Sequence, residues 1–285
     1  MSGRVALNRI GSGRYGLSGF GLKIIAILAM LLDHIGASLY PSSIWLRAVG
    51  RLAFPIFAFL ICEGFIYTRS VKRYAMRLGV FAIFSEIPYN LLHSDHFFDL
   101  GAQNIFLTLL IGLLTIFGIH WFRYDNGEPT ERAAGADTAV GSVNAAGEAS
   151  AATPRPPPRS SEIPRRPIQW MVIFAGIVLA ELLRTDYGAF GVMIIIMFYI
   201  LRDRRGTAAL CLIAANIAFG LLSFIYGNLP LQALAGLAAA PLLLYNGKKG
   251  HSVKYLFYTF YPVHIAVLMA IKYFVFNLPL MLFKM

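Results

Sequence analysis

Long apolar runs separated by short polar turns form the main pattern of this chain. Many runs reach the roughly 20 residues with which an α-helix crosses a bilayer. Because only helices and closed barrels satisfy all backbone polar groups in lipid, the pattern predicts an all-α, polytopic transmembrane helix bundle of about nine to ten spans. The expected spans cover residues 21–40, 44–67, 74–92, 104–122, 168–183, 188–201, 207–225, 231–244 and 255–282.

Two prolines lie inside these runs and change the expected shape of their helices. Pro55 is expected to kink the second span, because proline removes a backbone N–H and neighbouring helices tolerate such kinks in a membrane. Pro262 interrupts the long final run. That run is either one kinked span or a short helix followed by a span.

The composition agrees with a membrane protein and indicates one membrane domain. The 285 residues are 58% hydrophobic and 14% charged, and the mean hydropathy is +0.64. Residues 123–167 are rich in Ala, Gly, Ser and Pro, so they are predicted to form a disordered cytoplasmic insert. Residues 1–20 are interpreted as a cytoplasmic tail. Residues 21–122 and 168–285 together form the membrane domain.

The distribution of charge predicts the orientation in the membrane. The net charge is +11, and the basic residues lie between spans, which favours ordinary membrane topology over nucleic-acid binding. Basic turns alternate with weakly charged turns, so the positive-inside rule predicts a multi-pass protein of the cell membrane with a cytoplasmic N-terminus and an external C-terminus. Cys62 and Cys211 lie inside apolar runs, which suggests neither a disulfide nor a metal site.

Ionisable side chains inside the spans are the candidates for chemistry, because such groups are costly in lipid and usually face a polar interior. His34, Arg51 and Glu86 each lie roughly 10 Å below the predicted outer surface. They come from three different spans, so the sequence predicts a polar layer in the outer half of the bundle. Further polar residues near this layer are Asn104, Asp186 and His264.

Each of these residues has a chemical and a structural interpretation. His34 is either a general base, because imidazole exchanges protons near neutral pH, or a residue bonded to a neighbouring helix. Asp33 points about 100° away from His34 on the same helix, so Glu86 from another span is the expected orienting group. Arg51 either stabilises negative charge on an acyl group or pairs with a carboxylate. His264 has the same two interpretations as His34.

A second group of candidates lies at the predicted inner surface. Arg69, Arg73 and Arg77 are spaced four apart and would share one helical face if their helix began early. Lys248 and Lys249 stand between two glycines in another basic turn. These charges either follow the positive-inside rule or bind the phosphates of a cytosolic donor, for which arginine is well suited.

The residues described so far resemble those of the TraX family, named for the F-pilin acetylase of conjugative plasmids. The most specific block is Gly50-Arg51-Leu52-Ala53-Phe54-Pro55-Ile56-Phe57-Ala58-Phe59. Other similar stretches are 22–26, 33–36, 63–64, 86–88, 104–108, 186–192, 244–248, 257–258 and 261–264. The resemblance covers the membrane portion and leaves out residues 123–167.

The resemblance implies an integral membrane acyltransferase that moves an acetyl or other acyl group from cytosolic acyl-CoA to an amine or hydroxyl, without a metal. The acceptor stays open between a pilin-like peptide, a glycan and a small molecule. The expected catalytic residues are His34, Arg51, Glu86 and Asp33. The expected donor-binding residues are Arg69, Arg73, Arg77, Lys248 and Lys249. Other candidates are Glu63, Asn104, Asp186, Tyr258 and His264.

Two other classes of protein fit the same charged residues. A proton- or solute-coupled transporter would use Asp33, His34, Arg51, Glu63 and Glu86 to line a path through the membrane. A structural membrane subunit would use them without any chemistry. Saturable binding of acyl-CoA would favour the enzyme over both alternatives.

Overall fold

The computed structural model describes residues 16–94, 97, 99, 101–124, 166–251 and 254–274. Within these ranges the chain is helical, apart from turns and two isolated β-bridges. In order, the helices are α1 (Gly19–Ser38), α2 (Ile44–Gly50), α3 (Ala53–Tyr67), α4 (Val71–His93), α5 (Ile105–Tyr124), α7 (Pro167–Leu182), α8 (Gly188–Ile200), α9 (Arg205–Ile225), the 3-10 helix η1 (Leu231–Ala238), α10 (Ala239–Leu243) and α11 (Lys254–Phe274). The all-helical prediction is therefore confirmed.

Five helical segments are long and apolar enough to cross a membrane. They cover Gly19–Ser38, Ile44–Tyr67, Ile105–Phe122, Arg205–Ile225 and Tyr255–Phe274. Three shorter apolar helices cover Pro167–Leu182, Gly188–Ile200 and Leu231–Leu243. Several apolar helices thus indicate a membrane protein, whereas the expected number of about nine to ten spans is not confirmed.

The second expected span is divided into two helices, and the interruption does not lie at Pro55. α2 ends at Gly50 and α3 begins at Ala53, so the break falls at Arg51 and Leu52. Pro55 lies in the first turn of α3, where a proline is tolerated because the first N–H groups of a helix have no partner within it. The proline therefore accompanies a helix start instead of a kink.

Pro262 does not interrupt its helix. α11 continues through it as one helix up to Phe274. The described part of the final run is therefore a single helix, and residues 275–282 lie outside the described residues. Most of the predicted insert, residues 125–165, and most of the N-terminal tail, residues 1–15, also lie outside them.

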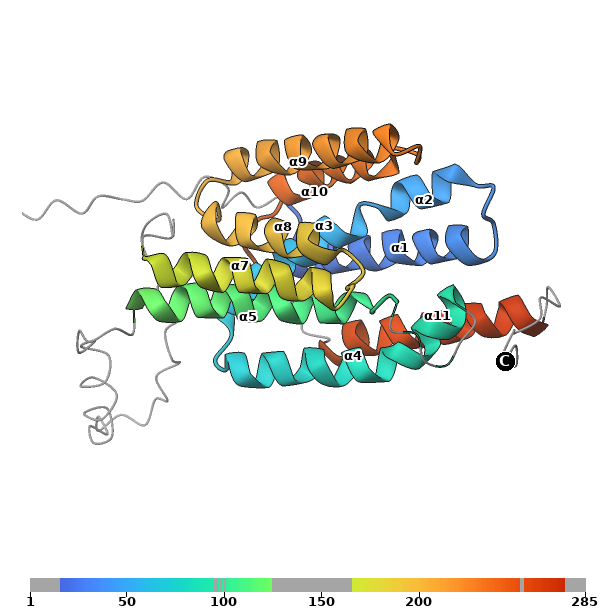
Figure 1. Cartoon of the computed structure of the whole chain (residues 1–285), viewed down its shortest axis with the longest axis horizontal. Coiled ribbons are helices and arrows are strands. Elements are labelled where there is room, and N and C mark those ends of the chain that lie inside the picture. The colour runs from blue at the N-terminus through green and yellow to red at the C-terminus, as the bar shows by residue number, and fades with distance from the viewer. Residues whose placement is uncertain are drawn as a thin grey trace, which may run out of the picture.

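The helices run side by side along the long axis of the molecule, so their turns gather at two ends (Figure 1). α1 packs on α2, α3 and α11, while α5 packs on α4, α7 and α8. α9 packs mainly on η1 and α10. Large apolar side chains such as Leu22, Ile56, Leu113 and Ile195 are completely buried between the helices. Many others on the outside are exposed, which suits a surface in contact with lipid.

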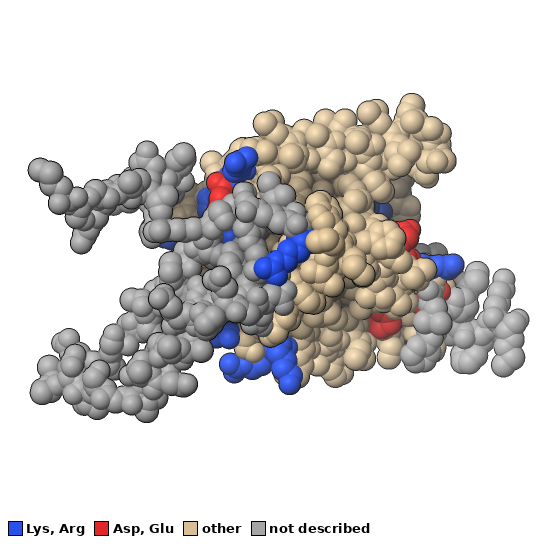
Figure 2. Space-filling view, turned by 60° about the vertical axis from the view of Figure 1, so that its left-hand side comes forward, with Lys and Arg blue, Asp and Glu red and all other residues tan. Residues whose placement is uncertain are grey.

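The positions of the turns follow the alternation of charge along the sequence. Backbone bonds join Gln103 to Arg184, and a separate bridge joins Leu17 to Tyr245. The first contact joins two weakly charged turns at one end of the molecule. The second joins the segment before α1 to the segment before the basic turn 247–250 at the other end. Figure 2 shows most Lys and Arg side chains gathered toward the left-hand side of the surface. This end is called the basic end, and the opposite one the weakly charged end.

Candidate functional site

Two histidines from distant parts of the chain meet inside the bundle. His34 lies near the C-terminal end of α1, and His264 lies within α11; they are only 9% and 6% exposed. Nδ1 of His34 is 2.7 Å from Nε2 of His264. The residues are 230 positions apart in the chain, so the packing of α1 against α11 creates the pair.

A backbone carbonyl fixes the proton positions in this pair. Nδ1 of His264 is 2.7 Å from the carbonyl oxygen of Phe260, which can only accept, so this nitrogen donates. In the neutral ring, Nε2 of His264 then holds a lone pair and accepts the N–H of His34 Nδ1. The lone pair of neutral His34 consequently lies on Nε2. This geometry suits a general base that is oriented by a second imidazole.

Aromatic packing holds both rings. Tyr261 lies edge-on to each, with ring centroids 5.9 Å from His34 and 5.7 Å from His264. Phe260 stacks on His264 at 4.7 Å. Ser38 donates a 2.6 Å hydrogen bond to the carbonyl of His34 at the end of α1. The pair therefore sits in an ordered, largely apolar environment.

Glu86, which was expected to orient His34, has a different described partner. The amide nitrogen of Asn104 donates to the Glu86 carboxylate and, at 2.8 Å, to the carbonyl of Ala82. The amide oxygen of Asn104 accepts the N–H of Phe106 and caps the start of α5. Asn104 thus ties α4 to α5. The orienting partner that the structure gives His34 is His264 instead of Glu86.

An ion-pair cluster lies beside the histidines in the sequence, at the weakly charged end. Asp33 accepts from Arg47 at 3.3 Å, and its other oxygen is 3.4 Å from Arg51. A Cβ on Gly50 would lie 2.7 Å from the Cα of Asp33, so only glycine lets α2 approach α1 this closely. Of the two interpretations of Arg51, the structure favours pairing with a carboxylate. Its action on an acyl group stays a prediction.

The turn between α7 and α8 completes this cluster. Arg51 interacts electrostatically with Tyr187, whose ring stacks on Phe54 with centroids 3.8 Å apart. Protein atoms crowd the carboxyl of Asp186, although the residue retains exposed surface. This desolvation raises the pKa of Asp186 to about 6, against the lowering effect of Arg51. The cluster therefore combines two cations with the carboxyls of Asp33 and Asp186.

At the basic end, Arg69 does not share a helical face with the arginines that follow it. α4 begins at Val71, and Ser70 caps it by accepting the N–H of Arg73 at 3.3 Å. Arg69 precedes the helix, so the early helix start that a shared face would require does not occur. Arg69 and Arg73 are both exposed.

Arg77, one turn further along α4, points toward aromatic side chains. Its guanidinium lies 5.7 Å from the ring centroid of Tyr74 and interacts electrostatically with Tyr258. Tyr258 stacks on Phe81 with centroids 5.2 Å apart. Tyr258 therefore joins α11 to α4 by packing.

Lys248 and Lys249 lie beside the start of α1. Their carbonyls accept the N–H groups of Gly19 and Phe20 at 2.7 and 3.0 Å, and both residues are exposed. Nearby, Glu63 accepts a 2.9 Å hydrogen bond from the hydroxyl of Tyr245. Glu63 therefore lies in a separate polar group at the basic end, away from the ion-pair cluster at the other end of α2–α3.

The structure unites some predicted residues and adds others. It joins His34 to His264 and Arg51 to Asp33, whereas Glu86 and Asn104 form a separate contact. The residues that sequence reasoning missed are Arg47, Tyr187 and Tyr245. The signal for Arg47 was its position beside a polar turn, whereas Tyr187 and Tyr245 lie in the family-like stretches 186–192 and 244–248. Within the described ranges, no three His, Cys, Asp or Glu residues are grouped to hold a metal.

Comparison with known proteins identifies the family. The chain is 29% identical over 278 residues to a probable fimbrial assembly protein FimC, serogroup H1, of Dichelobacter nodosus, covering 90% of this chain and 96% of that protein. It is 30% identical over 96 residues to the uncharacterized protein RP591 of Rickettsia prowazekii (strain Madrid E), covering 34% and 35%. No solved structure matches. The TraX protein model matches residues 18–126 and 160–272, so the chain belongs to the TraX family.

Proposed function

We propose that this TraX-family membrane protein is an acyltransferase that moves an acetyl or other acyl group from cytosolic acyl-CoA to an acceptor amine or hydroxyl. The observation that carries the proposal is the buried His34–His264 hydrogen bond, which leaves the lone pair of neutral His34 on Nε2. A general base of this kind is what an amine or hydroxyl needs to attack a thioester.

The proposed reaction is a single acyl transfer. Nε2 of His34 takes a proton from the acceptor while the acceptor nitrogen or oxygen forms a bond to the thioester carbonyl carbon. The carbon–sulfur bond then breaks, and the CoA thiolate leaves and takes the proton from the imidazolium. His264 accepts the Nδ1–H of His34 throughout, so it holds the ring in the active tautomer. Arg51 would stabilise the carbonyl oxygen only by moving from its pairing with Asp33.

The basic end supplies the proposed donor site. Arg69, Arg73, Lys248 and Lys249 are exposed there, as a group that meets the phosphates of a soluble nucleotide must be. Arg77 lies deeper, against Tyr74 and Tyr258. The acceptor would approach from the weakly charged end. A pilin-like peptide amine is the first acceptor to test, because the name of the Dichelobacter relative refers to fimbrial assembly.

The test measures acyl transfer and acyl-CoA binding by the purified protein in detergent. His34→Ala should lower turnover about 10²- to 10⁴-fold, because it removes the base. Acyl-CoA affinity should survive, since the imidazole does not act on the phosphates. His120→Ala is the matched control: His120 is another histidine within the helices, in α5, and its Nδ1 lies 3.1 Å from the hydroxyl of Tyr199 in α8, away from the His34–His264 pair. Near-normal transfer by folded His34→Ala protein would remove the proposed base.

A proton-coupled transporter is the second candidate, because two hydrogen-bonded histidines also suit a proton relay. Reconstituted protein separates the two functions. Proton flux across vesicles that is lost in His34→Ala, with no saturable acyl-CoA binding by the wild type, would favour the transporter.

A further inference from the structure

A pocket opens at the basic end between α8 and α9. It is a shallow depression: the 330 Å³ of empty space there includes open solvent, and the enclosed part is about 20 Å³, room for about one water molecule. α8 packs mainly on α5, α7 and α3, whereas α9 packs mainly on η1 and α10, so the two helices diverge and leave room between them. The lining residues are Phe59, Phe198, Leu201, Arg202, Arg205, Ala208, Ala209, Leu242 and Leu243.

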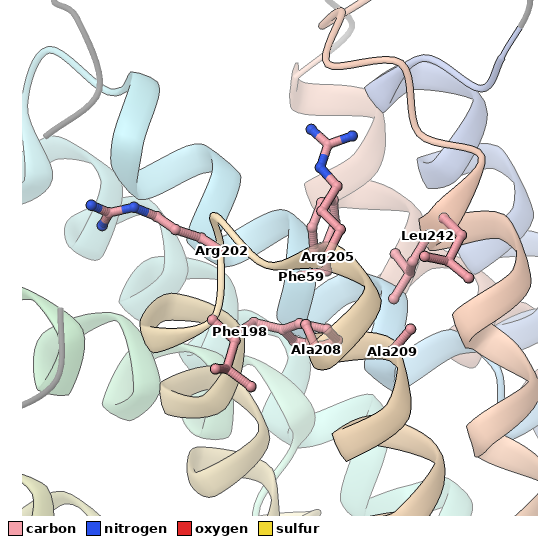
Figure 3. Close-up of a pocket in the computed structure, with 9 residues that line it drawn as sticks. Phe59, Phe198, Arg202, Arg205, Ala208, Ala209 and Leu242 are labelled. Atoms are coloured by element: carbon pink, nitrogen blue, oxygen red, sulfur yellow. The ribbon is translucent and has the colours of Figure 1, made fainter. Parts of the chain in front are cut away.

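Arg205 is held at the mouth of this pocket. Its Nη1 donates a 2.7 Å hydrogen bond to the carbonyl of Tyr245, and its guanidinium carbon lies 5.2 Å from the ring centroid of the same tyrosine. Tyr245 is fixed in turn by its hydrogen bond to Glu63. Figure 3 shows the Arg205 guanidinium standing over Phe59. The bond to Tyr245 uses one of five N–H donors, so the others can bind an anion.

Arg202 adds positive charge without joining Arg205. Its guanidinium lies 5.3 Å from the ring centroid of Tyr199, and its Nε is 3.9 Å from the carboxylate of Asp203. In Figure 3 the two arginine side chains point in different directions. Arg205 is therefore the direct anion-binding group, and Arg202 contributes to the positive potential at the mouth.

The floor below the arginines is apolar. Phe59 and Phe198 meet edge to face with centroids 5.6 Å apart. Ala208 and Ala209 present small side chains one turn below Arg205, about 5 Å along α9. Leu243, which is 53% exposed, extends the apolar lining to the outer surface of the bundle. A ligand that fits must carry an anion at one end and apolar chains at the other.

We propose that this pocket binds one anionic phospholipid, with the phosphate on Arg205 and an acyl chain on the exposed apolar surface at Leu243. The pocket lies at the basic end, which the positive-inside rule assigns to the cytoplasmic leaflet, where anionic lipids attract basic residues. A nucleotide is a poorer fit, because its base and ribose need polar partners and the lining offers only arginines. The site is separate from the histidine pair and does not depend on acyltransferase activity.

The experiment uses purified full-length protein and native mass spectrometry to compare adducts of dioleoylphosphatidylglycerol and dioleoylphosphatidylcholine. These lipids have the same chains and differ in headgroup charge. The wild type should prefer phosphatidylglycerol. Arg205→Gln should reduce that preference about 10-fold or more, because charge-assisted hydrogen bonds to the phosphate are lost. Arg204→Gln removes the same charge from an exposed neighbour outside the lining, and it should retain the preference.

A second variant tests the apolar lining without changing the charge. Leu243→Ser removes an exposed apolar side chain from the lining and should also weaken phosphatidylglycerol binding, and it provides the test if Arg205→Gln fails to fold. Equal loss in Arg204→Gln and Arg205→Gln would reduce the effect to general surface charge and overturn the proposal. Displacement of phosphatidylglycerol by added CoA would assign the pocket to a nucleotide and overturn the lipid assignment. Equal binding of the two lipids by the wild type would overturn it as well.

Discussion

His264 offers the sharpest test of how the histidine pair works. Its Nε2 accepts the N–H of His34 Nδ1 across 2.7 Å, and both residues are buried. His264→Ala removes this acceptor and leaves the His34 N–H without it in an apolar environment. Such a loss costs about 1–3 kcal/mol, which corresponds to about 5- to 150-fold in a rate that depends on the correct tautomer.

His264→Gln is the matched variant, because an amide oxygen can accept from His34 Nδ1 as an imidazole nitrogen does. The assay is acyl-transfer turnover at saturating donor, together with the Kd of acyl-CoA. His264→Ala should lower kcat by the stated factor and leave Kd unchanged, and His264→Gln should recover most of the loss. The recovery separates a positioning role from simple packing, since glutamine and alanine both remove the aromatic ring.

The double variant decides whether His264 acts through His34. If it does, His264→Ala should have no further effect on turnover in a His34→Ala background, because coupled residues are not additive. An equal loss in both backgrounds would refute the reasoning, and so would unchanged turnover of a folded His264→Ala single variant. Circular dichroism and gel filtration establish that each variant is folded.

Three further predictions test the surroundings of the pair. Gly50→Ala should lower Tm by the equivalent of about 1–3 kcal/mol, because its Cβ would lie 2.7 Å from the Cα of Asp33, whereas Gly206→Ala meets nothing within 4 Å and should not lower it. The pKa of Asp186 is raised from 3.8 to about 6, so the folded state binds this proton more tightly than the unfolded chain does. The resulting contribution to the free energy of unfolding is complete below pH 3.8 and is lost as the pH rises through 6. Asp186→Asn should therefore raise Tm at pH 8 and leave it unchanged near pH 3; a higher Tm at both would contradict this sign. A cysteine at Ser94 should react with an impermeant thiol reagent on intact cells, and labelling only after lysis would reverse the predicted orientation.

The sequence predicts the helices well, because hydropathy reports local composition. The expected span at residues 21–40 corresponds to α1, and the one at 168–183 corresponds to α7. Helix starts depend on capping hydrogen bonds, which hydropathy does not report. The Ser70 side chain caps α4, so the helix begins at Val71 and Arg69 lies outside it. The number of true spans is harder to predict, because α4 mixes apolar with polar residues and several helices are short.

The partners of the polar residues were less predictable, because they depend on which helices touch. His34 and His264 were both candidates, but nothing in the hydrophobic pattern indicates that α1 lies against α11. The rule that a histidine base is oriented by a carboxylate pointed to Glu86. The structure instead uses Asn104 to bind Glu86, and a second histidine to bind the first. Sequence thus gave the candidate residues, while their pairing required the packing of distant helices.

The cost of charge in lipid explains why the polar residues separate into two kinds. The full charges of Arg47, Arg51 and Asp33 lie together at the weakly charged end, where their side chains keep 19–30% of their surface exposed and the two cations share the carboxylate of Asp33. The histidine pair is more deeply buried, and the two hydrogen bonds described for its rings are satisfied with both rings neutral. A neutral resting base needs no buried counter-ion. A charge would then arise on His34 only during turnover, and the thiolate formed in the same step would be the group that removes it.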